Sequence, residues 1–272
     1  RRGLAFLAAR QLPSGQFPIE ATLAYKTGCP VLDDASPFAT THVVHSLGFM
    51  PRPEVQPMLD RALAYMRREM TGPGLWRYWN RDAAWEGRPI FSFIPADLDD
   101  TASHSALLRR HGVAFPDNRH LMLHNRDREG RFYTWFVPRL QATADLRYWR
   151  AVLGEVTLAR MTVFWRTTEA GYDDVDSVVN ANVLLYLGDR PETTPVIRWL
   201  TEIIEQGCEA ETDKWYRDVF TFHYAVSRCH HAGIGGFGPL KATIHDRLAA
   251  AARSDGRIGD HAMHTALAVN TL

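Results

Sequence analysis

The chain has 272 residues, of which 46% are hydrophobic, and its 31 basic residues balance 31 acidic ones. This length allows one large hydrophobic core, and the balanced charge argues against nucleic acid or an acidic polymer as a partner. Three scattered cysteines are too few for a disulfide framework, which predicts a reducing, cytoplasmic location. No apolar run reaches the roughly 18 residues that span a bilayer, so no transmembrane segment is expected.

Apolar residues recur with the period of a helix along most of the chain, and strand-like alternation is almost absent. Glycines and prolines gather between the periodic stretches, where they end helices and turn the chain. The pattern therefore predicts an all-α protein. The predicted helical stretches are, in chain order, residues 2–11, 36–49, 55–71, 97–110, 139–165, 174–187, 192–208, 216–232, 238–252 and 259–271.

A loop pattern of glycine, any residue and an aromatic residue recurs between these stretches. Glycine supplies a left-handed helix end, and the aromatic side chain then fills the gap between adjacent helices. The pattern predicts a structural repeat of stacked helix pairs, and a closed ring of pairs would bury every face. The copies are Gly15-Gln16-Phe17, Gly74-Leu75-Trp76 and Gly130-Arg131-Phe132, with degenerate copies at Gly171-Tyr172 and Gly256-Arg257-Ile258.

The run from Asp97 to Ala102 places three carboxylates, Asp97, Asp99 and Asp100, within four positions at the start of a predicted helix. Like charges in a small, poorly hydrated volume cannot all ionise cheaply, so one carboxyl retains a proton and can act as a general acid. Acids at a helix start also cap free amides and suit the helix dipole. The residues alone leave both interpretations open.

The same run, Asp97-Leu98-Asp99-Asp100-Thr101-Ala102, resembles the Asp-x-Asp-Asp-Thr-Ala signature of class II terpene cyclases, which include squalene-hopene cyclases and copalyl diphosphate synthases. The spacing from Arg2-Gly3 to Gly15-Gln16-Phe17 is similar to the Gln-Trp repeat of that family, with Phe17 in place of tryptophan. The resemblance implies that residues 1–272 form a single α/α toroid, a double ring of helices.

The resemblance also implies a function, namely protonation-initiated cyclisation of a linear isoprenoid such as a prenyl diphosphate. Asp99 occupies the position of the general acid, and Asp97 and Asp100 would support it. No cofactor is obligatory, although Mg²⁺ would accompany a diphosphate. Family members normally pair two toroids, so the resemblance further implies a partner chain or a second copy that closes the cavity.

Two residues after the acids are candidate supporting groups. Thr101 can form a hydrogen bond within the same turn. His104 lies four residues after Asp100 and can pair with it on one helix face, although a half-exposed surface histidine fits the sequence equally well.

Aromatic side chains tolerate a carbocation through cation–π attraction, so some of them are candidates to line a cyclase cavity. Most aromatic residues of a chain are core residues, however. The candidate lining residues are Phe91, Phe93, Trp76 and Trp165, and Asn180 is a candidate for positioning the water or base that takes the final proton.

Two other clusters support rival interpretations. The acids Asp173, Asp174 and Asp176 could hold Mg²⁺ or cap a helix, and capping is the simpler explanation. The run Cys229-His230-His231, with Cys208, contains zinc-ligand residue types, although a buried structural cysteine is simpler. The alternatives to a class II cyclase are therefore a zinc-dependent toroid enzyme and a toroid that binds an isoprenoid or a partner without turnover.

Overall fold

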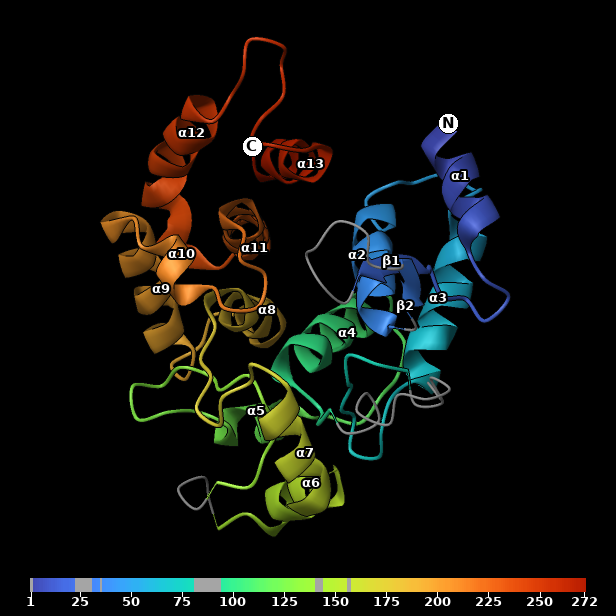
Figure 1. The fold of residues 1–272 in the computed structure, drawn as a ribbon, viewed down its shortest axis with the longest axis vertical. Coiled ribbons are helices and arrows are strands. Elements are labelled where there is room, and N and C mark those ends of the chain that lie inside the picture. The colour runs from blue at the N-terminus through green and yellow to red at the C-terminus, as the bar shows by residue number, and fades with distance from the viewer. Residues whose placement is uncertain (1, 23–30, 35, 81–93, 140–143, 156–157) are drawn as a thin grey trace. The chain divides into compact units, whose positions relative to one another are not determined.

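A computed structural model describes residues 2–22, 31–34, 36–80, 94–139, 144–155 and 158–272. The chain divides into two compact units, residues 1–118 with 146–171 and residues 119–145 with 172–272. Apart from one short hairpin, the elements named within the described ranges are helices (Figure 1). The predicted all-α class is confirmed, whereas the closed ring and the single domain stay predictions.

The first unit is built around three packed helices. Its elements are α1 (Arg2–Arg10), α2 (Pro37–Leu47), α3 (Gln56–Arg68), α4 (Leu98–Arg110), α6 (Leu146–Glu155) and α7 (Leu158–Thr167), with the strands β1 (Ile19–Thr22) and β2 (Val31–Asp34). Helix α2 packs against both α3 and α4. Their apolar faces enclose a core that includes Leu47, Met66, Trp76 and Leu108, each at most 1% exposed. Helix α4 is therefore anchored along its length, which fixes the turn that precedes it.

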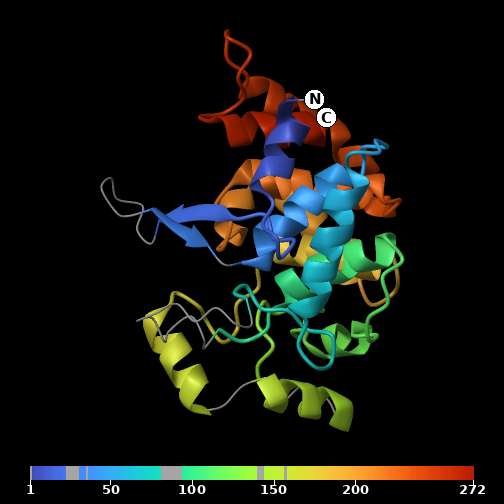
Figure 2. The ribbon, with the colours of Figure 1, turned by 90° about the vertical axis from the view of Figure 1, so that its right-hand side faces the viewer.

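The hairpin of β1 and β2 was not expected from the sequence. The two strands are antiparallel, with Ile19 opposite Asp34 and Thr22 opposite Val31. Figure 2 shows them extending away from α2 and α3. Four residues are too few for period-two alternation to stand out against a helical background, so the pattern gave no signal.

The single helix predicted over residues 139–165 is wrong. Arg139, Ala144 and Asp145 are not helical, and α6 begins at Leu146. Helices α6 and α7 are separate elements that point in different directions (Figure 2). Gly154, which weakens a helix interior, lies in the last turn of α6. Apolar periodicity runs through both helices, which is why the sequence suggested one long helix.

The second unit contains α5 (Arg119–His124), α8 (Ser177–Leu187), α9 (Thr194–Gln206), α10 (Glu209–Thr212), α11 (Val219–His231), η2 (Gly235–Leu240), α12 (Lys241–Ala250) and α13 (Ala262–Thr271). Helix α11 packs against α8 and α13. Helix α8 is buried around its circumference, with ten of its eleven residues buried. A helix that is apolar on all sides requires such an interior position, so α8 forms the centre of this unit.

The predicted loop repeat is confirmed at four places. Gly15, Gly74, Gly130 and Gly256 all have left-handed backbone angles, with φ between 84° and 98°. The residue two positions later turns inward, and Phe17, Trp76 and Phe132 are at most 3% exposed. Each glycine thus reverses the chain so that a large side chain can enter the core.

A hydrogen-bond clamp, which the sequence did not reveal, holds each of these loops. The main-chain N–H of the residue two positions after the glycine donates to a side chain on a helix that comes later in the chain. This side chain lies four residues after the N-cap of that helix. The four bonds are Phe17 N to Thr40 Oγ1 at 2.9 Å, Trp76 N to Thr101 Oγ1 at 3.1 Å, Phe132 N to Asn180 Oδ1 at 2.8 Å and Ile258 N to Thr265 Oγ1 at 3.1 Å. Each copy of the repeat therefore uses two positions at the start of a helix. The first is the N-cap residue, and the second, four residues later, is the residue whose side chain forms the clamp.

Candidate active site

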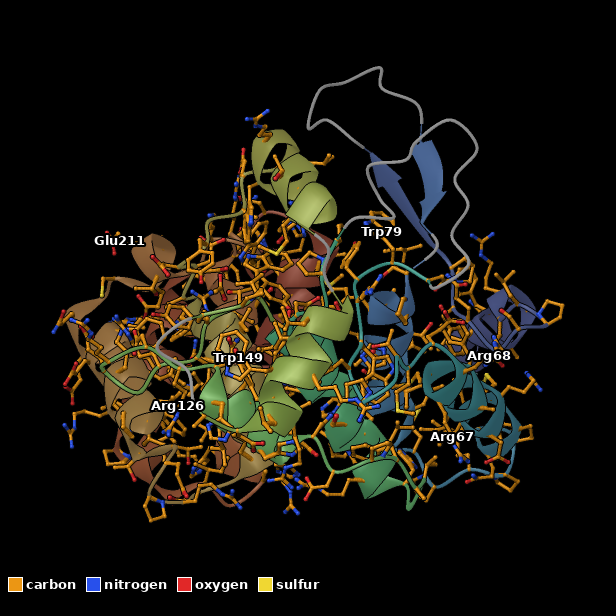
Figure 3. The ribbon with its side chains drawn as sticks, turned by 90° about the horizontal axis from the view of Figure 1, so that it is seen from below. Arg67, Arg68, Trp79, Arg126, Trp149 and Glu211 are labelled. Atoms are coloured by element: carbon orange, nitrogen blue, oxygen red, sulfur yellow. The ribbon has the colours of Figure 1, made fainter. Side chains whose placement is uncertain are left out.

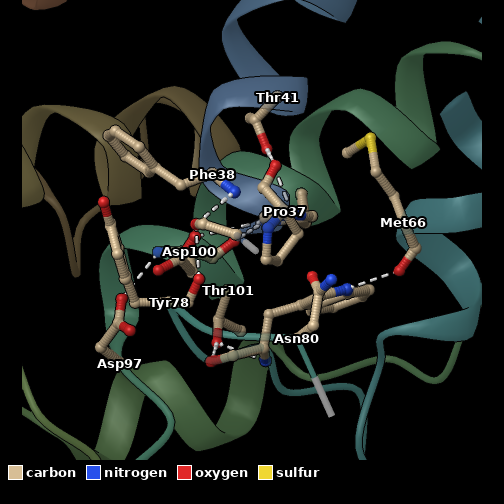
Figure 4. A network of polar contacts seen from close by, with 12 residues as sticks. Pro37, Phe38, Thr41, Met66, Tyr78, Asn80, Asp97, Asp100 and Thr101 are labelled. Carbon is tan, nitrogen blue, oxygen red and sulfur yellow. Dashed lines mark hydrogen bonds and ion pairs between the residues drawn. The ribbon is translucent and has the colours of Figure 1, made fainter. Parts of the chain in front are cut away.

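The candidate site is the turn that leads into α4. Asp97 is the N-cap of this helix, and its Oδ1 accepts the N–H of Asp100 at 2.8 Å. The N–H of Asp97 donates to the main-chain oxygen of Trp76 at 3.2 Å, which ties the turn to the preceding loop. Figure 4 shows this network. The capping interpretation therefore holds for Asp97, because its side chain satisfies an amide that the helix leaves free.

Capping does not account for Asp99 and Asp100. In the other three copies of the repeat, the two corresponding positions carry Phe38 and Ala39, Val178 and Val179, and Met263 and His264. Those helices form without an acid at either position. The second and third carboxylates of the α4 turn are thus additions that the fold does not require.

The cap residues of two copies also differ in their second carboxylate oxygen. Asp176, the N-cap of α8, accepts the N–H of Val179 through Oδ1, and its Oδ2 accepts the N–H groups of Lys214 at 2.8 Å and Trp215 at 3.1 Å. The Oδ2 of Asp97 is buried and has no hydrogen-bond partner among the residues that the structure describes. A buried, unbonded carboxylate oxygen is costly when charged, so this atom favours the protonated form.

The electrostatics of the turn lead to the same conclusion. Asp97, Asp99 and Asp100 are 4%, 9% and 2% exposed. Burial, and to a smaller extent the neighbouring Asp99 carboxylate, raise the pKa of Asp97 to about 8. Asp97 therefore keeps its proton at neutral pH, and its interaction with Asp99 couples the protonation of the two carboxyls. The turn can therefore hold a carboxylic-acid proton away from water.

The supporting residues both lie inside the first unit. Thr101 accepts the N–H of Trp76 and donates to its carbonyl oxygen at 3.4 Å, so it is the clamp of the repeat. His104 is fully buried rather than half-exposed, and its ring stacks on Trp76 with centroids 5.4 Å apart. Burial lowers the pKa of His104 to about 4. His104 is therefore neutral and does not form the charged pair with Asp100 that the spacing suggested.

The candidate lining residues have different surroundings. Trp76 is fully buried, and its indole N–H donates to the Met66 carbonyl at 2.7 Å. Trp165 is half-buried on α7. Asn180 accepts the N–H of Phe132 and donates to its carbonyl at 2.9 Å, so the side chain is fully engaged as a clamp. Phe91 and Phe93 lie outside the described residues.

The acids before α8 each have a partner within the second unit. Asp173 pairs with Arg139 at 2.9 Å, and Asp174 pairs with the Nζ of Lys214 at 2.6 Å. Asp176 caps α8, as the simpler interpretation expected. Among the residues that the structure describes, no three His, Cys, Asp or Glu side chains are grouped so as to hold a metal ion.

The cysteine and histidine run offers no assembled zinc site in the described part of the chain. Cys229 is fully buried, and its Sγ donates to the Ala181 carbonyl at 3.2 Å. Burial raises the pKa of this thiol to about 12, whereas a zinc ligand must be a thiolate. Cys208 is half-buried on the loop after α9, where its Sγ lies 3.8 Å from the Ile203 carbonyl. The thiol of Cys229 therefore acts as a core side chain.

The abundance of arginine, a residue suited to phosphate binding, is explained in part by local pairs. Figure 3 shows Arg67 and Arg68 extending from the end of α3, where cations suit the helix dipole. The Arg68 Nε lies 3.6 Å from Glu69, and its guanidinium lies 5.4 Å from the Tyr65 ring centre. These contacts give Arg68 a structural role at the surface.

Thr41 is a residue of this site that sequence reasoning missed. Its Oγ1 lies 3.1 Å from the Nε2 of His104, 63 positions away in the chain. The helical period placed both residues on buried faces but carried no signal that α2 and α4 meet at this point. Only the packed structure shows that the second helix reaches the acid turn.

No protein-family model and no curated protein matches this sequence. Solved structures do match. The structure of the type II terpene cyclase MstE from Scytonema covers 98% of this chain and 70% of its own, with 16% identity and a TM-score of 0.61.

Complexes of the same cyclase match equally well. An arginine-to-alanine variant bound to the substrate geranylgeranyl dihydroxybenzoate matches 98% of this chain and 69% of its own, at 15% identity and a TM-score of 0.59. An aspartate-to-alanine variant bound to the product merosterolic acid A covers 98% and 70%, at 16% identity and a TM-score of 0.60. The chain therefore has the fold of type II terpene cyclases. Within the described residues, no helix is long and apolar enough to cross a bilayer.

Proposed function

We propose that this protein is a class II terpene cyclase that protonates a linear isoprenoid and so starts its cyclisation, with Asp99 as the general acid. The observation that carries the proposal is the buried turn before α4, where burial and the neighbouring Asp99 raise the pKa of Asp97 to about 8. The other copies of the repeat have no acids at the positions of Asp99 and Asp100. The fold shared with type II terpene cyclases supports the same chemistry.

An alkene is a very weak base, so its protonation requires a neutral carboxylic acid in a site that excludes water. The Asp97–Asp99 pair meets this requirement because burial raises the pKa of Asp97 to about 8. The Oδ1 of Asp97 is committed to the helix cap, and Asp99 is the most exposed of the three acids at 9%. Asp99 is therefore the carboxyl best placed to deliver the proton, while Asp97 shares it and Asp100 supports the turn.

The proposed substrate is a linear polyprene, either a prenyl diphosphate or a prenylated aromatic compound. The structural neighbour acts on a geranylgeranyl dihydroxybenzoate, which has no diphosphate, so both head groups belong in the assay. The acid supplies the chemistry without a cofactor. Mg²⁺ is expected only as the counter-ion of a diphosphate substrate.

The test compares wild-type protein with Asp99→Asn and with Asp60→Asn, an exposed acid on α3 that serves as the matched control. Each is incubated with farnesyl diphosphate, geranylgeranyl diphosphate, squalene and a geranylgeranylated hydroxybenzoate, with and without Mg²⁺. Extracts are analysed by mass spectrometry coupled to chromatography. We expect a cyclic product from wild type and Asp60→Asn and none from Asp99→Asn, because the amide cannot donate a strong acid's proton.

A folded Asp99→Asn protein with unchanged turnover would overturn the assignment of the acid. No product from folded wild type with any substrate would count against the cyclase and favour a binding role or a missing partner chain. The fold of each variant is checked by circular dichroism and thermal unfolding.

A further inference from the structure

We propose that Thr41 on α2 keeps His104 in its neutral form and thereby makes His104 a positioning residue, so that the acid turn keeps its shared proton. The inference deepens the proposed function and rests on it. It concerns regulation of the same acid by two residues, neither of which touches substrate.

The tautomer of His104 follows from its two hydrogen bonds. Nδ1 lies 2.6 Å from the main-chain oxygen of Asp100, which can only accept. Nδ1 must therefore carry the proton, because the opposite tautomer would set two lone pairs against each other at this distance. The Nε2 of the neutral ring is then an acceptor, and the Thr41 hydroxyl, 3.1 Å away, donates to it.

This arrangement occupies the one lone pair through which His104 could take a proton. A hydrogen bond to the neutral form of a base disfavours the charged form, as does burial. Burial lowers the pKa of His104 to about 4. We infer that the Thr41 hydrogen bond acts in the same direction, because it engages the lone pair of Nε2. Stacking on Trp76 holds the ring in place for both contacts.

Neutrality matters because of what lies next to the ring. Within the described residues, the titratable group placed against it is the Asp100 carboxyl, whose Oδ1 lies 3.9 Å from Nδ1. Its contacts from α2 and from the loop before α4 are Thr41 and Trp76, which do not titrate at these pH values. A charged His104 would stabilise carboxylate at the turn and favour release of the proton shared by Asp97 and Asp99.

Thr41 also has a second acceptor within reach. Its hydroxyl lies 3.2 Å from the Pro37 carbonyl oxygen, one helical turn earlier. When His104 is protonated, its Nε2–H can donate to Thr41, and the hydroxyl can turn to Pro37. The two arrangements need no backbone movement, so acidification would switch the pair directly.

The experiment uses Thr41→Val, which keeps the shape of the side chain and removes the hydroxyl. Thr41→Ser restores the hydroxyl, and Thr201→Val is the matched control, because the Thr201 hydroxyl likewise donates to the carbonyl four residues earlier, that of Ile197, at 2.9 Å. Nitrogen-15 NMR of labelled histidine reports the tautomer and titration of His104, with His104→Gln used for assignment. This measurement requires no substrate.

In wild type we expect the Nδ1–H tautomer from pH 5 upward. Loss of one neutral hydrogen bond should raise the protonation constant of His104 about fivefold in Thr41→Val. Thr41→Ser and Thr201→Val should behave as wild type. In Thr41→Val alone, the acid limb of the pH–rate profile should move to higher pH, so that its midpoint lies at a proton concentration about fivefold lower.

A wild-type His104 with its proton on Nε2, or with a midpoint near 6.5, would overturn the inference. So would a Thr41→Val protein that folds and leaves the His104 titration unchanged, and so would an acid limb that stays in place while the titration moves. If Thr41→Val does not fold, Thr41→Ser tests the inference instead. This variant keeps the hydroxyl, so a His104 titration that differs from wild type would contradict the role of the hydroxyl. If Asp99→Asn keeps full turnover while the His104 titration of Thr41→Val shifts as expected, the assignment of Asp99 as the acid is refuted and the role of Thr41 is not.

Discussion

Replacement of Asp97 by asparagine should make the protein more stable at neutral pH. The folded pKa of Asp97 is raised from 3.8 to about 8, so the folded state binds a proton that the unfolded state releases. The stabilisation that this bound proton contributes is fully present below pH 3.8 and is lost as the pH rises toward 8. At pH 7 the loss amounts to about 4 kcal/mol, since each pKa unit is worth about 1.36 kcal/mol.

Asparagine escapes this cost because it is uncharged in both states, and it caps helices as well as aspartate does. Its extra N–H groups would be buried where Oδ2 of Asp97 has no partner within the described part of the chain, which costs about 1–3 kcal/mol. The expected net gain is about 2 kcal/mol at pH 7. It should disappear near pH 5 and become a loss of about 1–2 kcal/mol at pH 4, where wild type no longer has the charge cost but asparagine still buries its amide. Urea unfolding at pH 4, 5, 7 and 8, with equal slopes required, measures the difference.

The matched control is Asp176→Asn, at the same position of another copy of the repeat. There the new amide would face the N–H groups of Lys214 and Trp215, which would lose their acceptor. We expect Asp176→Asn to gain less than Asp97→Asn at every pH. An Asp97→Asn protein that is no more stable than wild type at pH 8, with the same pH dependence, would refute the shared proton.

Two further predictions concern the repeat and the thiols. Both glycines have left-handed backbone angles, but the Cβ of Gly15→Ala would overlap the Arg61 carbonyl, whereas that of Gly256→Ala would meet nothing within 4 Å. Thermal unfolding should therefore show a loss of stability of about 1–2 kcal/mol for Gly256→Ala and a clearly larger loss for Gly15→Ala. Equal losses would show that the close approach at Gly15 is unimportant. Cys229 should resist a thiol reagent at pH 8 in the folded protein while Cys208 reacts, because burial raises the pKa of Cys229 to about 12. Rapid labelling at Cys229, identified by peptide mass spectrometry, would contradict its place in the core.

The sequence predicted the helical class well because helix formation is signalled locally. Residues 97–110 were expected to be helical, and α4 runs from Leu98 to Arg110 with Asp97 as its cap. The hairpin at 19–34 and the break between α6 and α7 were missed, since neither leaves a periodic signal. The glycine turns were visible, but the clamps were not, because their partners are 23 residues apart at Phe17 and Thr40 and 48 apart at Phe132 and Asn180.

The site shows the same division between local and distant information. Three acids in four positions were visible in the sequence, and so was the capping alternative. In the described ranges the Oδ2 of Asp97 lacks a partner while that of Asp176 has two. The sequence did not reveal this difference, because it depends on Lys214 and Trp215, far along the chain. The charge state of His104 likewise depends on Thr41, a contact made only when α2 packs on α4.

Capping and acid catalysis, which the sequence presented as alternatives, are compatible in Asp97. One oxygen begins the helix, and the geometry of that bond fixes the direction of the other oxygen. The bond thereby prevents the side chain from rotating toward water, where its pKa would return to an ordinary value. The cap thus holds a carboxyl in the one orientation in which burial and Asp99 can keep it protonated. The helix start is therefore part of the acid, and a residue that caps without a carboxyl, such as serine, should preserve the fold and abolish the shared proton.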